Sequence, residues 1–144
     1  MINMKTFNVT RKIRFGHIDA AGIAFYPRLV EMLNDTVEDF FDQAIDYSFH
    51  KMHLQQKCGL PTVSLQVDFI KSIALGDEVL WSLNVLEISR SSFSVKIIAT
   101  STDVVHLTAD IKLVYVQLTD NGIKSTIIVD NIRKKLEEYS ANSR

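Results

Sequence analysis

The sequence predicts an α+β fold in which an antiparallel sheet curls around one long helix. Between Pro27 and about Asp46, apolar residues recur at spacings of three and four, the period of a helix buried along one stripe. From Thr62 nearly to the end of the chain, apolar and polar residues alternate in short runs, which is the period of half-buried strands. The connections between these runs are short, and this favours antiparallel neighbours because parallel strands need long crossovers.

A strand is expected first, from Lys5 to Phe15. Its apolar residues alternate with mostly polar ones and share one face: Phe7, Val9, Ile13 and Phe15. Arg11 interrupts this face, so we expect that end of the strand to be frayed or to lie at a sheet edge.

The helix is expected to begin close to Tyr26. Pro27 suits the first helical turn, where its missing N–H is not needed, and it disfavours helical geometry at the residue before it. Acidic residues form a second row along the helix: Glu31, Asp35, Glu38 and Asp42. We interpret this row as a solvated face. The alternative is a wall that faces a substrate or a subunit, with Asn34 and Asp35 beside a pocket.

The segment from Tyr47 to Leu60 is polar and is expected to be irregular. His50 and His53 lie at helical spacing, but they lack a carboxylate or thiol at a familiar metal-ligand spacing, so we expect no metal. Cys58 is expected to be a buried or incidental thiol, since nothing in its neighbours argues for an activated thiolate.

The remainder of the chain is expected to be mostly sheet. Strands are predicted over residues 62–69, 79–85, 93–99, 105–115 and 123–129. Turn signals stand at residues 76–77 and 119–122. Asp130 is expected to cap a final helix from Ile132 to Tyr139, and the tail from Ser140 is expected to be loose.

The composition indicates one globular domain over residues 1–144. A hydrophobic fraction of 47% and a charged fraction of 23% are ordinary for such a domain. The net charge of −1 gives no general attraction to nucleic acid or to an anionic membrane. One cysteine excludes an internal disulfide, and neither a signal peptide nor a membrane-spanning run is recognisable. We therefore expect a cytoplasmic protein.

A short, glycine-flanked loop before the helix carries the residues that point to chemistry. His17 and Asp19 stand two positions apart, and the free amides and positive end of the helix are expected near Asp19. A carboxylate beside free amides can attack a carbonyl or deprotonate water while the amides stabilise the developing negative charge. This arrangement predicts an acyl-transfer site. The alternative is an Asp19 that bonds local backbone, a His17 that packs, and a Gly22 that only makes a turn.

The loop also resembles the motif of a known family. The 4-hydroxybenzoyl-CoA thioesterase family, a hotdog-fold group, has an opening motif that resembles FGHIDAAGIAFYP at residues 15–27. The resemblance continues in order at residues 59–64, in the strand to Phe69, and at residues 87–93. It implies a hotdog fold, hydrolysis of an acyl-CoA thioester to a carboxylic acid and free CoA, and no cofactor. It also implies a homodimer or homotetramer with the site between subunits.

The resemblance implies roles for individual residues. Asp19 falls on the family's catalytic carboxylate, as nucleophile or general base, and Tyr26 falls where a backbone amide polarises the thioester carbonyl. His17 is a candidate auxiliary and Gly22 a candidate substrate contact. Arg90 lies where relatives contact the CoA phosphates. The best-known member that acts on an aromatic acyl group carries a run of basic residues there. Because this chain has only Arg90, an acyl carrier protein as donor, or a differently placed CoA, fits equally well.

Two other functional classes share the hotdog fold. A hotdog-fold hydratase or dehydratase relies on a His with a carboxylate on the central helix, whereas His17 and Asp19 precede the helix. A non-catalytic acyl-thioester binding protein needs no carboxylate beside the carbonyl. The position of Asp19 therefore favours a thioesterase over both.

Overall fold

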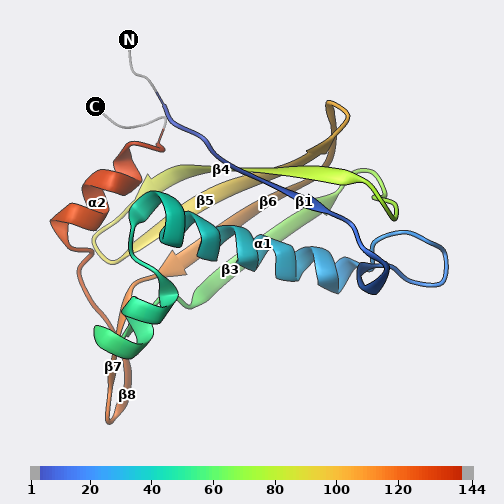
Figure 1. The fold of residues 1–144 in the computed structure, drawn as a ribbon. Coiled ribbons are helices and arrows are strands. Elements are labelled where there is room, and N and C mark those ends of the chain that lie inside the picture. The colour runs from blue at the N-terminus through green and yellow to red at the C-terminus, as the bar shows by residue number, and fades with distance from the viewer. Residues whose placement is uncertain (1–3, 141–144) are drawn as a thin grey trace.

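A computed structural model describes residues 4–140 and contains a five-stranded antiparallel sheet with α1 lying along one face (Figure 1). The strands are ordered β1-β4-β5-β6-β3. Their bounds are Phe7–Lys12 for β1, Thr62–Phe69 for β3, Glu78–Ile88 for β4, Ser92–Ser101 for β5 and Val104–Val114 for β6. Every neighbouring pair is antiparallel. The predicted α+β class is confirmed.

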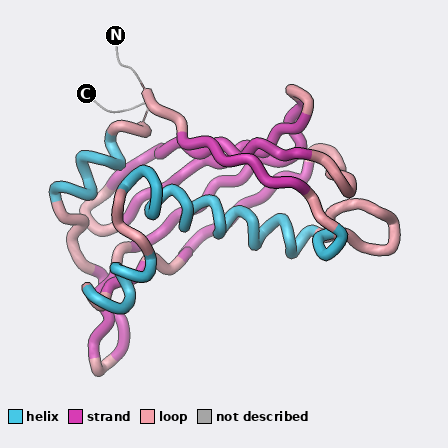
Figure 2. The backbone as a smooth tube through the Cα atoms, viewed as in Figure 1, coloured by secondary structure: helices cyan, strands magenta, loops and turns pink. Residues whose placement is uncertain are grey.

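A smaller sheet and several helical segments complete the chain (Figure 2). The small sheet contains β2 (Cys58–Gly59), β7 (Val116–Thr119) and β8 (Gly122–Ser125). The helical segments are η1 (Phe15–His17), α1 (Tyr26–Phe40), η2 (Phe41–Ile45), η3 (Lys51–Gln55) and α2 (Asp130–Glu137). Within residues 4–140, no helix has both the length and the apolar content needed to cross a bilayer.

The core lies between α1 and the sheet. The helix buries one stripe, which contains Leu29, Met32, Leu33, Thr36, Val37 and Phe40. The sheet supplies buried side chains that include Trp81, Leu83, Ile97 and Leu107. Fully burying one large apolar side chain contributes about 1.5–3 kcal/mol, so this stripe holds α1 in place. α1 ends at Phe40, earlier than the predicted end near Asp46; η2 continues the helical path to Ile45, and Asp46 follows with a left-handed φ of 59°.

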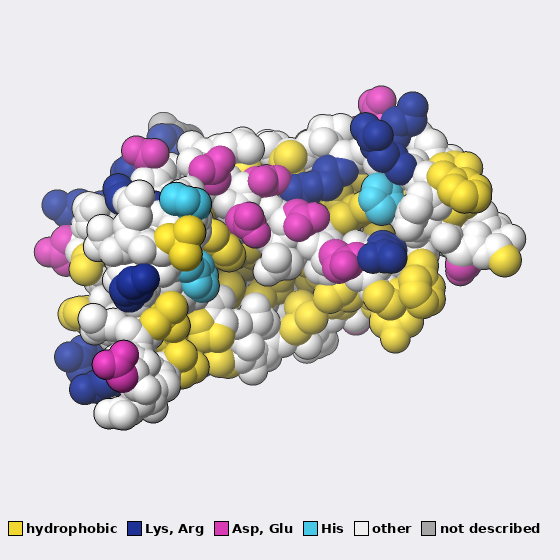
Figure 3. Space-filling view, turned by 60° about the horizontal axis from the view of Figure 1, so that its bottom comes forward, with side chains coloured by type: hydrophobic (Ala, Val, Ile, Leu, Met, Phe, Trp, Pro, Cys, Tyr) yellow, Lys and Arg dark blue, Asp and Glu magenta, His cyan; other side chains and the backbone are white. Residues whose placement is uncertain are grey.

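The polar face of α1 is exposed, in agreement with the solvated interpretation of its acidic row. Acidic side chains gather in the middle of one face of the molecule, with Lys, Arg and His side chains near its end (Figure 3). β1 lies at a sheet edge, which is one of the two expectations for this strand, and Arg11 is half-buried rather than frayed. Its guanidinium donates to Thr36 Oγ1 at 2.9 Å and forms an ion pair with Asp39, which ties β1 to α1.

Several predicted boundaries are wrong. The first strand ends at Lys12, and Phe15 is exposed because the chain turns into η1 after the buried Ile13. The last strand ends at Ser125 rather than at residue 129. Asp130 is the first residue of α2 and not its cap, because Val129 holds the cap position.

The polar segment after α1 is more ordered than predicted. It forms η3, which buries Met52, and then β2, which buries Cys58. Ser140, where the loose tail was expected to begin, is instead buried and bridged to Val85, so the prediction is wrong for this residue; residues 141–144 lie outside the described residues.

Candidate active site

The loop that carries Asp19 is a tight turn closed by its own backbone. The Asp19 N–H donates to the Ile23 carbonyl at 3.0 Å, and the Gly22 N–H donates to the Asp19 carbonyl at 3.0 Å. Gly22 has a φ of +80°, a conformation that other residues rarely adopt. A Cβ at this position would meet nothing within 4 Å. The turn therefore requires glycine for its conformation and not for room.

The turn is anchored to the segment that connects β3 to β4. The Ala24 N–H donates to the Ile73 carbonyl at 2.7 Å, and the Leu75 N–H donates to the Gly22 carbonyl at 3.1 Å. These bonds place the Asp19 loop at the end of the sheet where β4 begins.

Asp19 is exposed, and its carboxylate is oriented by one local hydrogen bond. Its Oδ1 accepts from the Ala21 N–H at 2.8 Å. Within residues 4–140, Oδ2 has no hydrogen-bond partner. The backbone bond that the alternative interpretation expected is therefore present, and it leaves one carboxylate oxygen available for chemistry.

The start of α1 offers a free backbone donor. Tyr26 is the first residue of the helix, and Pro27 follows it without an N–H. Within residues 4–140, the Tyr26 N–H has no hydrogen-bond acceptor. It lies at the positive end of the helix dipole, where an anionic oxygen is stabilised. The Tyr26 ring is mostly exposed and contacts Phe69 and Phe25.

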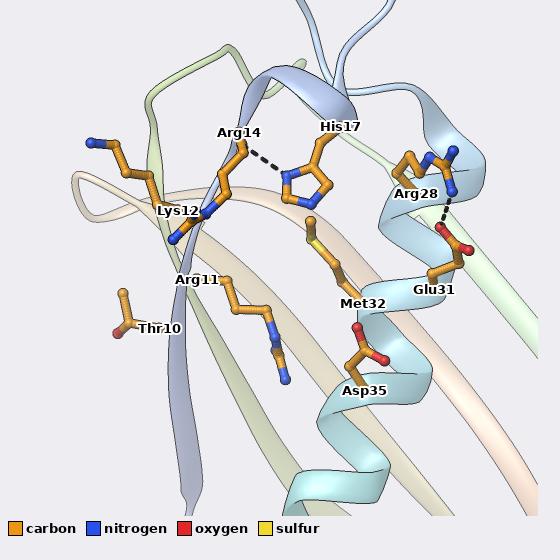
Figure 4. Close-up of a pocket in the computed structure, with 9 residues that line it drawn as sticks. All are labelled: Thr10, Arg11, Lys12, Arg14, His17, Arg28, Glu31, Met32 and Asp35. Atoms are coloured by element: carbon orange, nitrogen blue, oxygen red, sulfur yellow. Dashed lines mark hydrogen bonds and ion pairs between the residues drawn. The ribbon is translucent and has the colours of Figure 1, made fainter.

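His17 is turned into a hollow between β1 and α1 (Figure 4). Its Nδ1 accepts from the Arg14 N–H at 2.8 Å, so in the neutral ring the proton is on Nε2. Asp19 does not line this hollow, and the described residues contain no hydrogen bond between the two side chains. The structure therefore does not join His17 to Asp19 directly.

The hollow beside His17 has a volume of about 420 Å³ and is rich in cations. Its basic residues are Arg11, Lys12, Arg14 and Arg28, and the acidic Glu31 and Asp35 of α1 line it as well. Arg28 pairs with Glu31 at 2.9 Å. Within residues 4–140, neither Lys12 nor Arg14 has a carboxylate at ion-pair distance. Sequence reasoning missed this cluster, although the closely spaced basic residues 11, 12 and 14 were a usable signal.

An apolar pocket lies on the other side of the loop, with a volume of about 270 Å³. Its walls come from the loop (Ile23), the start of α1 (Tyr26, Leu29), the end of β3 (Phe69) and the start of β6 (His106). Ile23 is also the residue that accepts the Asp19 N–H, so the pocket and the carboxylate share one loop. This hollow suits an apolar acyl group. The sequence carried no signal for His106, which lies in an otherwise apolar run.

Arg90 lies at the opposite end of the sheet, in the turn between β4 and β5. Its carbonyl accepts from the Ile128 N–H at 2.9 Å, and Arg133 donates to the neighbouring Ser89 carbonyl at 2.6 Å. Strand β4, with 11 residues, separates this turn from the Asp19 loop. A strand of that length spans roughly 35 Å. One copy of the chain therefore does not bring the β4–β5 turn and the loop before α1 together (Figure 1).

The other candidates lie away from the loop. His50 and His53 are both exposed. Cys58 is buried, and its thiol lies 3.5 Å from the Gln56 carbonyl. Residues 4–140 hold no group of three His, Cys, Asp or Glu side chains arranged to bind a metal ion.

Comparison with known proteins gives a consistent match. A family model described as the thioesterase-like superfamily matches residues 13–136. The 1,4-dihydroxy-2-naphthoyl-CoA hydrolase of Prochlorococcus marinus (strain MIT 9515) is 26% identical over 139 residues, which cover 92% of this chain and 90% of that protein. The corresponding enzyme of Nostoc punctiforme is 25% identical over 100 residues, covering 69% of this chain and 67% of that protein.

Solved structures share the architecture. The 4-hydroxybenzoyl-CoA thioesterase from Pseudomonas sp. strain CBS-3 superimposes with a TM-score of 0.84 at 18% identity, covering 90% of this chain and 98% of that one. A 1,4-dihydroxy-2-naphthoyl-CoA thioesterase from Synechocystis gives a TM-score of 0.81 at 18% identity, covering 92% of this chain and 96% of that one. These matches confirm the predicted hotdog fold.

Proposed function

The chain belongs to the thioesterase-like superfamily, and on this premise we propose that it hydrolyses an acyl-CoA thioester to a carboxylic acid and free CoA. One observation supports the location of the reaction. The unpaired Tyr26 N–H stands at the start of α1, and the loop before it carries the exposed carboxylate of Asp19. Thioester hydrolysis needs two groups: a hydrogen-bond donor that stabilises the oxyanion, and a carboxylate that acts as nucleophile or base.

In this mechanism the thioester oxygen accepts the Tyr26 N–H, and the helix dipole stabilises the negative charge that develops on it. Asp19 then acts in one of two ways. As a nucleophile, it attacks the carbonyl carbon, the C–S bond breaks, and water hydrolyses the resulting mixed anhydride. As a general base, it takes a proton from water, whose oxygen attacks the carbonyl carbon before the thiolate leaves.

Other loop residues hold this geometry. His17 anchors the chain through its bond to Arg14, so we assign it a positioning role for the loop. Gly22 sets the conformation that presents Asp19. The acyl group enters the apolar pocket that Ile23 and Tyr26 line, and this places its carbonyl near the start of α1.

We further propose that the active unit is a homodimer, or a tetramer built from such dimers, joined along β3. This strand lies at a sheet edge and pairs with β6 alone. Leu65 is 44% exposed and Phe69 51% exposed, although the sequence predicts them to be half-buried. The β6 residues opposite Leu65, Val67 and Phe69 are buried: Ile111, Ala109 and Leu107.

The apolar row of β3 thus continues the core face of the sheet, but one copy leaves about half of Leu65 and Phe69 exposed. Such an edge, with unpaired backbone groups beside exposed apolar side chains, is a site for pairing with another chain. A second copy paired along β3 bonds the free backbone groups and covers the apolar side chains. We propose that Arg90 of a second copy contacts the CoA phosphates, because within one copy Arg90 lies far from the Asp19 loop.

The test is thiol release from a panel of CoA thioesters with aliphatic and aromatic acyl groups. The proposal expects turnover of at least one of them without an added metal or cofactor. Faster turnover of the same acyl group on an acyl carrier protein would instead identify that protein as the donor. Failure of every thioester on both carriers would overturn the proposed reaction.

The free Cys58 and the absence of any disulfide within residues 4–140 are compatible with the cytoplasm, where we place the reaction.

A further inference from the structure

His106 is a buried histidine in the wall of the apolar pocket, at the start of β6. It is 7% exposed. Its Nδ1 lies 2.9 Å from the Ser72 carbonyl and 3.3 Å from the Lys71 carbonyl. Because carbonyls only accept, Nδ1 carries the proton. The His106 carbonyl in turn accepts the N–H groups of Ile70 and Lys71, at 2.9 and 3.1 Å. The residue is therefore held rigidly from both its side chain and its backbone.

The second ring nitrogen of His106 is unused. Within residues 4–140, Nε2 has no hydrogen-bond partner. Trp81 Nε1 is the one fully enclosed side-chain nitrogen or oxygen without a hydrogen bond in the described chain. Nε2 is therefore not fully enclosed by protein, and His106 lines the apolar pocket. In the neutral ring with its proton on Nδ1, Nε2 is a hydrogen-bond acceptor.

The surroundings make this acceptor selective. The pocket wall is mostly apolar and includes Ile23, Leu29 and Ile73, while Lys71 and Ser72 are its other polar members. A ligand that displaces water from this pocket leaves Nε2 unsatisfied unless the ligand itself donates a hydrogen bond, and an unsatisfied buried polar group is costly. A site built around a hydrogen bond therefore rejects an analogue that lacks the partner group.

We propose that His106 is a specificity-determining residue that selects acyl groups carrying a hydroxyl donor. This inference rests on the proposed thioesterase function and names the class of its substrate. The pocket volume of about 270 Å³ accommodates either a ring or a short chain, since an apolar cavity of about 150 Å³ is enough for benzene. The hydroxyl donates to Nε2 while the thioester carbonyl lies at the start of α1.

The experiment compares matched pairs of CoA thioesters that differ by one hydroxyl. The pairs are benzoyl-CoA with its three hydroxybenzoyl isomers, and butyryl-CoA with 3-hydroxybutyryl-CoA. Thiol release gives kcat/KM for each. We expect the wild type to prefer a hydroxylated member of a pair over its parent by about tenfold, the value of a net hydrogen bond near the upper end of the usual range.

The informative variant is His106→Asn. The asparagine amide N–H reaches the position of Nδ1 and keeps the bond to the Ser72 carbonyl, but no atom remains at the position of Nε2. We expect kcat/KM for the hydroxylated member to fall about tenfold, while the parent stays within about twofold of the wild-type value. In His106→Gln an amide oxygen can occupy the position of Nε2, so part of the preference should return.

Two results would overturn the inference: a hydroxyl preference that survives in His106→Asn, or a wild type that shows no preference in any pair. An equal fall for both members of a pair would also reject it, since that is the signature of a purely structural histidine. Calorimetric binding of the same pairs as non-hydrolysable thioether analogues measures the preference without turnover. A hydroxyl preference in binding that is lost in His106→Asn, with no turnover of any thioester, would support the inference while rejecting the proposed reaction.

Discussion

The rings of Tyr26 and Phe69 meet edge to face, with centroids 6.0 Å apart and ring planes at 79°. Tyr26 is the first residue of α1, and Phe69 is the last residue of β3. Such a contact contributes about 0.5–1.5 kcal/mol beyond the burial of the two rings. The helix start that presents the free amide is therefore braced against the end of the strand that we expect to join two copies. A change along β3 should reach the candidate active site through this contact.

Leu65→Lys should convert the assembly to monomers and lower activity. The substitution places a charge in the apolar row of β3, and Lys on an edge strand opposes pairing with another chain. Analytical ultracentrifugation should give a larger species for the wild type and a single species of 16.4 kDa for the variant.

The matched control is Ile123→Lys, which changes a 65% exposed residue on the small sheet. It should leave both mass and activity unchanged. A fully active wild-type monomer at assay concentration would contradict the proposed assembly.

Asp19→Asn should keep the fold and the assembly but lose most of the thioesterase activity. The change is nearly isosteric and keeps the oxygen that accepts the Ala21 N–H, but it removes the charge needed for attack or proton abstraction. Loss of a general base costs about 10²–10⁴-fold in rate. Thiol release from the best substrate measures the loss. Asp120→Asn, in the exposed turn between β7 and β8, serves as the control. A folded Asp19→Asn enzyme with near wild-type turnover would exclude both mechanisms.

Gly22→Ala should weaken the loop, whereas Gly16→Ala should not. Both glycines have room for a Cβ, but only Gly22 has a positive φ. A left-handed conformation costs a residue with a Cβ roughly 1–2 kcal/mol. We expect the Gly22 variant to lose about 1 kcal/mol of unfolding free energy and to turn over more slowly, because the loop presents Asp19. Denaturant unfolding and thiol release check the two effects. Equal behaviour of the two variants would show that the loop conformation does not matter.

Arg90→Ala should raise KM for an acyl-CoA while leaving kcat nearly unchanged. A phosphate contact far from the reacting carbon binds ground state and transition state alike, so its loss is a loss of uniform binding. The effect should shrink as salt rises, because an exposed charge contact is screened. KM and kcat for an acyl-pantetheine, which lacks the nucleotide, should not change with the substitution. Lys134→Ala, an exposed cation on α2, is the control. The same change in KM with both substrates would show that Arg90 does not bind the nucleotide.

Tyr115→Phe should make the protein more resistant to alkali. The Tyr115 and Tyr47 hydroxyl groups are hydrogen-bonded at 3.2 Å in the interior, and burial raises the pKa of both tyrosines above the ordinary value. Above pH of about 10 the unfolded chain loses these protons and the folded chain keeps them, so the unfolding free energy falls as pH rises.

Removing one such group should make that fall less steep by about 1.4 kcal/mol per pH unit. At neutral pH the variant should lose only the hydrogen bond, about 0.5–1.5 kcal/mol. Urea unfolding from pH 8 to pH 11 measures both effects. Parallel curves for variant and wild type would refute the assignment.

The sequence by itself determined the elements that depend on neighbours in the chain. The period of three and four residues after Pro27 specified α1, because a helix with one apolar stripe must bury that stripe. Alternation specified the main strands, and the motif around Asp19 specified the loop and its family. Gly22 was recognisable as a turn glycine, since φ is a property of one residue and its turn.

Only the tertiary structure decided which contacts join distant parts of the chain. Arg11 looks like an interruption of a strand until Asp39 and Thr36 lie beside it. The alternation in β3 predicts a half-buried strand, but its burial depends on what covers the face. Within one copy Leu65 and Phe69 stay about half exposed, even though Tyr26 contacts Phe69. His106 is held in the pocket wall by hydrogen bonds to the carbonyls of Ser72 and Lys71, which lie more than 30 residues earlier in the chain. Periodicity records which side of an element is apolar, whereas burial and hydrogen-bond partners depend on elements brought together by folding.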